Sequence, residues 1–255
     1  MHDLKDLINY RANENVLQGK NILITGASDG IGRAAALSYA QHGATVILLG
    51  RNEEKLTAVY DEIESRGGPQ PAMMPLDFTT AGDAAFRLLA EQIDEQIGSL
   101  HGLLHNAGML GQIKPLAQTS SNDFEQLLKV NLSCNFSLTK ALLPALQRAE
   151  QASLVFTSSG VGRQGRAYWG GYAVAKFGVE GLMQVWADEL GEASNVRVNS
   201  LNPGATCTAM RRQAYPAEPP SDNPSPDDIM GAYLFLMSDD SLAVNGHALD
   251  AQKKK

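Results

Sequence analysis

The sequence predicts a doubly wound α/β fold, in which one parallel sheet carries helices on both faces. Short apolar runs alternate along the chain with longer segments of helical periodicity. Strands separated by helices of that length need right-handed crossovers and therefore pair in parallel. Polar residues follow several of the expected strands (Asn106, Ser159 and Asn202), at the sheet edge where such folds bind their ligands.

The order of the elements follows from where the two periodicities begin and end. Strands are expected at residues 21–25, 45–49, 72–76, 102–105, 153–157, 196–201 and 248–250. Helices are expected between them at 31–42, 53–66, 81–97, 123–146, 170–190 and 226–237. Asn122 and Glu125 resemble a capping pair for the long helix at 123–146. Pro144 should loosen the last turn of that helix because proline supplies no N–H.

The stretch 207–226 does not fit this alternation. It contains prolines at 216, 219, 220, 224 and 226, too many for a helix interior. We expect either a loop that lies over the site as a substrate lid or a disordered insertion without function. The whole chain, 1–255, is expected to be one nucleotide-binding domain, with 251–255 as a mobile tail.

The composition is typical of a globular protein in aqueous solution. The chain is 44% hydrophobic and 19% charged, and its net charge of -7 disfavours a general nucleic-acid surface. Residues 1–20 contain acidic side chains and no uninterrupted apolar stretch, so we expect neither a signal peptide nor a membrane contact. Cys134 and Cys207 have neither the number nor the spacing of a disulfide framework or a zinc site, which favours free thiols in the cytoplasm and no metal.

A glycine-rich turn joins the first expected strand to the first helix. It reads Thr25-Gly-Ala-Ser-Asp-Gly-Ile-Gly32, and its glycines would let the backbone approach a pyrophosphate at the helix N-terminus. The candidate cofactor-binding residues in the turn are Gly26, Ser28, Asp29, Gly30, Ile31 and Gly32. Such a turn alone could be structural, but the strand before it and the helix after it favour a nucleotide site.

The end of the second expected strand indicates which dinucleotide would bind. An NAD site usually carries an acidic residue about 20 positions past the glycines. Here the strand ends in Gly50-Arg51-Asn52, and a guanidinium can pair with a 2′-phosphate. Arg51 therefore favours NADP over NAD, unless it is an ordinary solvated arginine. Glu53 and Glu54 fit the first turn of the next helix better than a ribose contact.

The run from Ser159 to Lys176 carries the candidate chemistry. In a helix, Tyr172 and Lys176 are four residues apart and share one face, so an ammonium can lie beside the phenol. A neighbouring cation would lower the phenol pKa from its usual value of about 10, which would suit Tyr172 to acid–base work near neutral pH. The hydroxyl of Ser159 could orient a substrate carbonyl.

Together these motifs resemble those of the short-chain dehydrogenase/reductase family, over residues 21–250. The glycine turn resembles the family's cofactor turn, His105-Asn-Ala-Gly108 the motif after its fourth strand, and Asn202-Pro-Gly204 its loop beside the nicotinamide. Ser159, Tyr172 and Lys176 match its active site. The resemblance implies a Rossmann fold. It is strongest to a bacterial branch of oxidoreductases that brings no substrate with it.

The resemblance also implies a role for each matching residue. Tyr172 would move the proton, Ser159 would hold the substrate oxygen, and Lys176 would tune the phenol and bind the nicotinamide ribose. The backbone of Asn131 would hold a water that links Lys176 to solvent. Cofactor contacts would also come from Asp77 and Phe78 at the adenine, from Asn106, Ala107 and Gly108, and from Pro203, Gly204, Thr206 and Thr208 beside the carboxamide.

Three features depart from the family's pattern. His105 stands where asparagine is commoner, and we expect the change to affect strand packing rather than chemistry. Thr206 replaces a branched apolar residue at a contact that is made through the backbone. After Asp250 the chain lacks the usual pair of glycines, which weakens the case for a tetramer. We therefore expect a homodimer through the helices of Asn131 and Tyr172, with a tetramer as the alternative.

The implied reaction is reversible hydride transfer between NADP(H) and a carbonyl or alcohol carbon of a small molecule. Two alternatives stay open: an epimerase or dehydratase that reuses Tyr172 and Lys176, and an NADP-binding regulator without turnover. The substrate groove is expected to be largely apolar, with Gly160, Val161, Gln164, Trp169, Tyr215 and parts of 207–226 in its walls. Arg163 and Arg166 would either bind an acidic group or, as we favour, be solvated.

Overall fold

The computed structural model describes residues 4, 7–191 and 194–253. Among them, seven strands form one sheet in the order β3-β2-β1-β4-β5-β6-β7, and every neighbouring pair is parallel. The strands are β1 Asn21–Thr25, β2 Thr45–Gly50, β3 Ala72–Pro75, β4 Gly102–His105, β5 Ala152–Thr157, β6 Val196–Asn202 and β7 Ala248–Asp250. The predicted fold class is thereby confirmed. Strand order reverses between β1 and β4, which is the switch point where such sheets open a ligand crevice.

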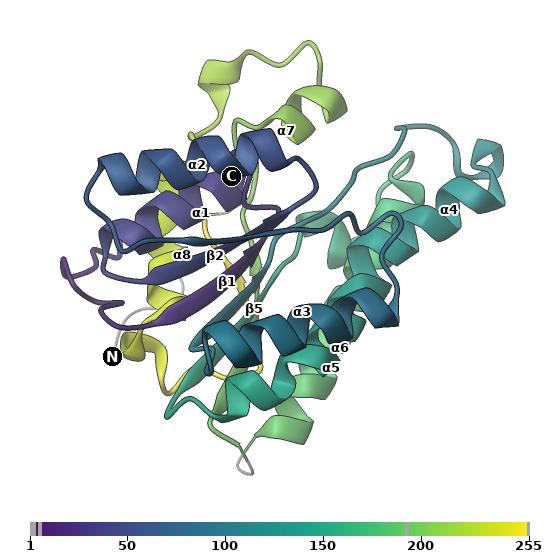
Figure 1. The fold of residues 1–255 in the computed structure, drawn as a ribbon. Helices are drawn as coiled ribbons and strands as arrows, with labels where there is room; N and C mark the ends of the chain where they lie inside the picture. The colour runs from purple at the N-terminus through teal and green to yellow at the C-terminus, as the bar shows by residue number, and fades with distance from the viewer. Residues whose placement is uncertain (1–3, 5–6, 192–193, 254–255) are drawn as a thin grey trace.

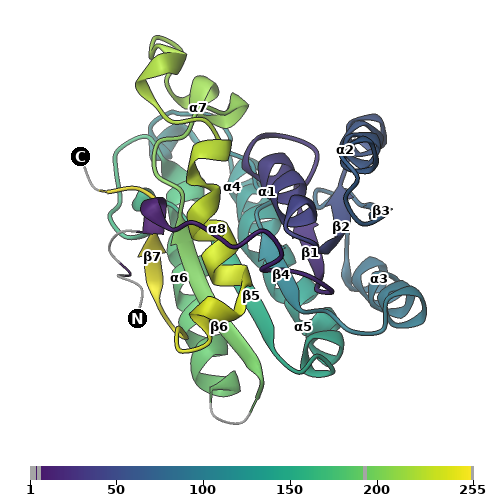
Figure 2. The same cartoon turned by 90° about the vertical axis from the view of Figure 1, so that its left-hand side faces the viewer.

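Helices cover both faces of the sheet (Figures 1 and 2). On one face lie α1 Gly30–Gln41, α2 Glu53–Ser65 and α8 Met230–Met237, and on the other lie α3 Asp83–Gln96, α5 Cys134–Gln147 and α6 Gly170–Leu190. Two more helices are α4 Ser121–Leu128, which packs against α6, and α7 Ala209–Ala214, which lies at the top of Figure 1. No helix in the described part of the chain is long and apolar enough to span a bilayer.

Two apolar clusters form the core, one on each side of the sheet. Along β1, Ile22 and Ile24 pack into the cluster with α1, α2 and α8, whereas Leu23 packs into the cluster with α3 and α5. The strands are continuous apolar runs because both of their faces are covered. Polar side chains that serve a site are therefore concentrated where the strands end.

The long helix expected at 123–146 is interrupted. A π-helical turn, Lys129–Ser133, separates α4 from α5, and the N–H of Cys134 donates to the carbonyl of Lys129, five residues back. The cap also differs from the predicted pair, because Ser120 caps α4 by accepting from the N–H of Asp123. Pro144 lies inside α5, which continues to Gln147.

The carboxyl-terminal third has more regular structure than the sequence suggested. The segment 207–226 contains α7 and a 3-10 turn at Pro220–Asp222, and the helix expected from 226 is a 3-10 turn, Asp227–Ile229, followed by α8. Residues 251 and 252, expected in a mobile tail, are packed against the fold. Ala251 is fully buried, and the Gln252 side chain donates to the carbonyls of Pro203 and Ala205. Lys254 and Lys255 lie outside the described residues.

Candidate active site

The glycine turn forms a cradle that has no room for larger residues. A Cβ on Gly32 would lie 2.1 Å from the carbonyl oxygen of Gly26, and a Cβ on Gly26 would lie 2.9 Å from the Cα of Ala107. Gly26 also has a φ of +69°, a region that favours glycine. Asp29 caps α1 by accepting from the N–H of Gly30 at 2.7 Å. The backbone thus comes close to the space above the helix N-terminus, as binding of a phosphate group requires.

The residues after β2 place two cations beside this turn. Arg51 is exposed, and Lys55 lies one turn into α2, where its ammonium is 3.0 Å from the Asp29 carboxylate. The hydrogen bond from Lys55 is the main cause that lowers the pKa of Asp29. Both cations border the same cavity as Asp29. This corner of the site can therefore accept a dianionic group, provided that Asp29 stays paired.

Thr25 and Asn131 fix the segment that follows β4. The Thr25 hydroxyl accepts from the N–H groups of Asn106 and Ala107, both at 2.9 Å. The fully buried Asn131 accepts from the N–H of Met109 at 3.1 Å and donates to its carbonyl at 2.9 Å. Asn131 also donates to the Leu127 carbonyl, inside the turn that precedes the π-helical segment. Its side chain is therefore a clamp on the Met109 backbone.

Tyr172 and Lys176 lie together in the amino-terminal half of α6. Both are buried, and the Lys176 ammonium lies 5.6 Å from the centre of the Tyr172 ring. Lys176 donates to the carbonyl of Thr157 at 2.7 Å, and the Ser159 hydroxyl lies near enough to the phenol to lower its pKa. The three side chains that the sequence singled out are thus brought together at the carboxyl end of β5.

Burial controls the protonation of this group. It raises the pKa of Tyr172 to about 12, against the smaller lowering effect of the Ser159 hydrogen bond. Burial also lowers the pKa of Lys176 to about 8, and the charge of Glu180 acts in the opposite direction. The expectation of a lowered phenol pKa is therefore wrong for this structure, because desolvation is the dominant effect on Tyr172. Tyr172 stays protonated at neutral pH, the form that a proton donor needs.

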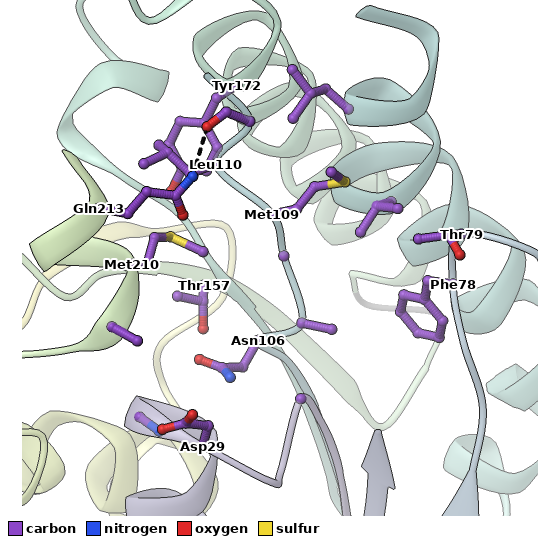
Figure 3. Close-up of a pocket in the computed structure, with 18 of the residues that line it drawn as sticks. Asp29, Phe78, Thr79, Asn106, Met109, Leu110, Thr157, Tyr172, Met210 and Gln213 are labelled. Carbon is purple, nitrogen blue, oxygen red and sulfur yellow. Dashed lines mark hydrogen bonds between the residues drawn. The ribbon is translucent and has the colours of Figure 1, made fainter. Parts of the chain in front are cut away.

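A cavity of about 820 Å³ connects the glycine turn with Tyr172. Figure 3 shows Asp29 at one end, Asn106 and Thr157 in the middle, and Tyr172 and Gln213 at the other end. Predicted site residues line its length: Gly26, Ser28, Asp29, Gly30, Ile31, Arg51, Asp77, Phe78, Asn106, Ala107, Gly108, Tyr172, Lys176, Pro203 and Thr208. Five other predicted residues are not part of the wall: Gly32, Asn131, Ser159, Gly204 and Thr206.

The end beyond Tyr172 has different walls from those expected. Met109, Leu110, Trp169, Met210 and Gln213 border it, and the Gln213 amide donates to the Gly111 carbonyl at 2.9 Å, the dashed line in Figure 3. Of the predicted groove residues, Trp169 and parts of 207–226 are in the wall. Gly160, Val161, Gln164 and Tyr215 are not.

Two further expectations concerned Arg163 and His105. Arg163 is partly exposed, but its guanidinium is paired with Glu180 and Asp250 and is not free for an acidic substrate. His105 is buried, its Nε2 lies 2.8 Å from the Thr139 hydroxyl, and its ring stacks on Phe156. Burial lowers the pKa of His105 to about 3. It is therefore a neutral packing residue, as the sequence suggested.

Sequence reasoning missed several residues of the cavity wall, and some of them carried a usable signal. Lys55 follows Arg51 by four residues, and α2 begins between them at Glu53. Both cations therefore lie close to the start of this helix and border the cavity. Met109 and Leu110 directly follow the recognised His105–Gly108 motif. Met210 and Gln213 lie on α7, and Thr208 indicates where that helix begins. Thr208 caps α7 by accepting from the N–H of Arg211.

Comparison with known proteins gives one consistent assignment. A family model for short chain dehydrogenases matches residues 20–219. The chain is 49% identical to the uncharacterized oxidoreductase YciK of Escherichia coli K12, over 96% of both chains. It is 32% identical to 3-oxoacyl-[acyl-carrier-protein] reductase FabG of Thermotoga maritima, over 91% of this chain and 96% of that protein.

A solved structure extends this similarity to three dimensions. A short chain dehydrogenase from Escherichia coli CFT073, complexed with NADPH, superimposes with a TM-score of 0.92 at 49% identity, covering 94% of this chain and all of the other. The resemblance seen in the motifs, and its direction toward the YciK branch, are thus confirmed. The cradle at Gly32, the buried Tyr172 and the matched family model together place this chain in the short-chain dehydrogenase/reductase family of oxidoreductases.

Proposed function

We propose that the protein is an NADP(H)-dependent oxidoreductase that transfers a hydride between the nicotinamide and a carbonyl or alcohol carbon of a small molecule. One observation carries the proposal. A protonated, buried Tyr172, near Ser159 and beside Lys176, lies at one end of a cavity whose other end is a phosphate cradle. A proton donor and a hydride carrier would then meet at one carbon.

The residues of the cavity fit a dinucleotide phosphate. The cradle at Gly26 and Gly32 excludes even a methyl group, so backbone N–H groups can approach a pyrophosphate. Arg51, supported by Lys55, would hold a 2′-phosphate, and Asp77 would hold the adenine. When bound, the nicotinamide supplies or accepts the hydride. Among similar proteins, the Escherichia coli CFT073 structure carries NADPH, which supports NADP over NAD.

The chain's own groups would handle the proton and the orientation of the substrate. Tyr172 would donate its proton to the substrate oxygen during reduction, and the nearby Ser159 hydroxyl would hold that oxygen. Lys176 keeps a positive charge near the phenol as it becomes phenolate, which stabilises the product state. The backbone of Asn131 would support the return of a proton from solvent.

The far end of the cavity indicates the kind of substrate. Met109, Leu110, Trp169 and Met210 give it an apolar wall, so we propose a substrate with a largely apolar body and one reactive oxygen. The segment 207–226 would act as the lid, because α7 contributes Met210 and Gln213 to this wall.

Removal of the phenolic oxygen of Tyr172 tests the proposed function. Tyr172→Phe should lower kcat by roughly a hundredfold to ten-thousandfold on any accepted carbonyl, because general acid catalysis contributes factors of this size, and should leave the Kd for NADPH within about threefold. Tyr168→Phe is the matched control, since Tyr168 is exposed and removing its hydroxyl should change neither quantity. Full turnover in Tyr172→Phe would contradict the assignment.

Other outcomes would point to the alternatives. Tight NADPH binding without turnover on a broad panel of ketones, aldehydes and alcohols would favour the regulator. Protein that purifies with a retained nicotinamide and consumes none would favour an epimerase or dehydratase.

We also propose a homodimer through α5 and α6. Three apolar side chains on α6, Val174, Phe177 and Val185, are each about half exposed and follow at helical spacing on one stripe. Phe136 on α5 is exposed to a similar degree and stacks on Trp186. Exposed apolar side chains that share a face mark an interaction surface. Light scattering should give a dimer mass, and Phe177→Asp should give the monomer.

The compartment stays a prediction. Cys134 and Cys207 are free thiols, which fits a reducing cytoplasm. Fractionation of cells that express the tagged chain should recover it with the cytoplasmic proteins.

A further inference from the structure

A buried carboxylate stands behind the catalytic pair. Glu180 lies one helical turn after Lys176 in α6 and is 7% exposed. It accepts from the hydroxyls of Ser158 at 2.5 Å and Ser200 at 2.6 Å, and from Nε of Arg163 at 3.1 Å. A buried carboxylate is tolerated when donors surround it, and these three come from two segments, the connection between β5 and α6 and the strand β6.

Arg163 connects this carboxylate to the end of the sheet. Its Nη1 pairs with the Asp250 carboxylate at 2.9 Å, and its Nη2 donates to the Leu249 carbonyl at 2.8 Å. The same Asp250 oxygen accepts from the Asn202 amide at 2.8 Å, and the Asn202 oxygen accepts from the N–H of Gly204. One connected set of bonds therefore runs from α6 through β7 to the loop at 202–204.

The same carboxylate also secures the chain that leads into Ser159. Lys176 holds the Thr157 carbonyl, and Glu180 holds the hydroxyl of the next residue, Ser158. Two successive residues of one segment are thus bound by two successive turns of α6. Ser159 is the next residue, so its position relative to Lys176 depends on both bonds.

We propose that Glu180 and Arg163 are positioning residues, which hold the Ser159 segment and the 202–204 loop in register with α6 and sustain the charged form of Lys176. For catalysis this inference rests on the proposed function. The part that concerns the charge of Lys176 does not, because that charge is measured in the protein without substrate. None of the roles assigned above to the catalytic and cofactor-binding residues includes either side chain.

The groups around Lys176 set the direction of the test. On α6 these are Tyr172 and Glu180; β4 contributes His105, α8 contributes Tyr233 near Tyr172, and Arg163 and Asp250 lie beyond Glu180. Of these groups, Glu180 is the carboxylate that shares α6 with Lys176, four residues further along the helix. Removing its charge disfavours the ammonium, whereas removing the Arg163 cation leaves Glu180 less neutralised and favours the ammonium.

An NMR titration of the full chain, with lysines isotopically labelled at Cε, measures this directly. Lys176→Arg assigns the Lys176 signal. In Glu180→Gln the pKa of Lys176 should fall by about one pH unit, and in Arg163→Gln it should rise, relative to the wild type. Glu189→Gln is the matched control, because Glu189 is exposed on the same helix and carries the same charge. Shifts of opposite sign from two ends of one network are not expected from simple structural damage.

The outcomes separate cleanly. If either variant titrates like Glu189→Gln, or both shift in the same direction, the proposal is overturned. Should Glu180→Gln fail to fold, Arg163→Gln decides alone, since its side chain is partly exposed. Where the wild type reduces a carbonyl, the high-pH limb of kcat/KM should move with the titration. Failure of the proposed function would show instead as absent turnover in the wild type, with the titration unaffected.

Discussion

The two ends of the cavity are built in different ways. At the glycine turn the walls are backbone, and a single added methyl group at Gly32 would overlap the Gly26 carbonyl. Beyond Tyr172 the walls are side chains from separate segments, and α7 meets the opposite wall through the bond between Gln213 and Gly111. The first end is fixed by local conformation. The second depends on how distant segments happen to pack.

This difference determines which part of the cavity can vary in sequence. A wall made of backbone accepts one shape, so it suits the part of a ligand that does not change. A wall made of Met109, Leu110 and Met210 can change with single substitutions and leave the fold intact. We therefore expect substitutions at the cofactor end to cost stability and cofactor affinity, and substitutions at the substrate end to change KM.

The largest effect should come from Gly32→Ala. Its Cβ would lie 2.1 Å from backbone and 2.6 Å from the Asn106 amide, and backbone cannot rotate away. Overpacking of this kind costs about 3 kcal/mol, or roughly 10 °C in Tm for a chain of this size. Gly165→Ala is the control, because nothing lies within 4 Å of its Cβ. Equal melting temperatures for the two variants would show that the cradle is not rigid.

The stability of the fold should depend on pH through Lys176, which lies where the two ends of the cavity meet. The pKa of Lys176 is lowered to about 8 in the folded chain from 10.5, so the buried ammonium destabilises the fold below pH 8, and this cost fades as pH rises from 8 to 10.5. Lys176→Met should therefore stabilise the protein at pH 7 by about 2 kcal/mol, after allowance for the lost bond to Thr157. Denaturant unfolding at pH 7 and pH 10 checks this. A gain that grows with pH would contradict the assignment.

A smaller effect is expected at the 2′-phosphate corner. Arg51→Leu should raise the Kd for NADPH by roughly tenfold to a hundredfold, the loss of one charge-assisted contact, and leave the Kd for NADH almost unchanged. Fluorescence titration with both cofactors measures this. Arg87→Leu, an exposed arginine on α3, is the control. Equal losses for both cofactors would mean that Arg51 acts through the fold rather than through the phosphate.

The smallest effect should come from the substrate end. Gln213→Ala removes the bond to the Gly111 carbonyl, worth about 1 kcal/mol, so KM for a carbonyl substrate should change by a few fold. The Kd for NADPH serves as an internal control and should not change. A large loss of NADPH affinity would show that the two ends of the cavity are not independent.

The features predicted most accurately are those that residues close together in the sequence determine. The strand at 45–49 and the observed β2, Thr45–Gly50, differ by one residue, because a covered parallel strand needs a continuous apolar run. The glycine turn was recognisable because its shape is set by its own residues. Tyr172 and Lys176 were recognisable because helical spacing places them side by side.

What escaped prediction depends on contacts between distant residues. The break between α4 and α5 accompanies the bonds of Asn131 to Met109, 22 positions away. The pairing of Arg163 with Asp250 spans 87 positions. The pKa of Tyr172 was misjudged because its burial comes from the packed structure, which a spacing rule does not contain.

The most direct test of the account follows the hydride itself. NADPH that carries deuterium at C4, in each of its two stereochemical forms, is mixed with the protein and a panel of carbonyl compounds, and the products are analysed by mass spectrometry. We expect one of the two forms to deliver deuterium to the former carbonyl carbon with the wild type, and almost none to arrive with Tyr172→Phe. Bound NADPH that delivers no label to any carbonyl, or equal delivery by Tyr172→Phe, would contradict the account.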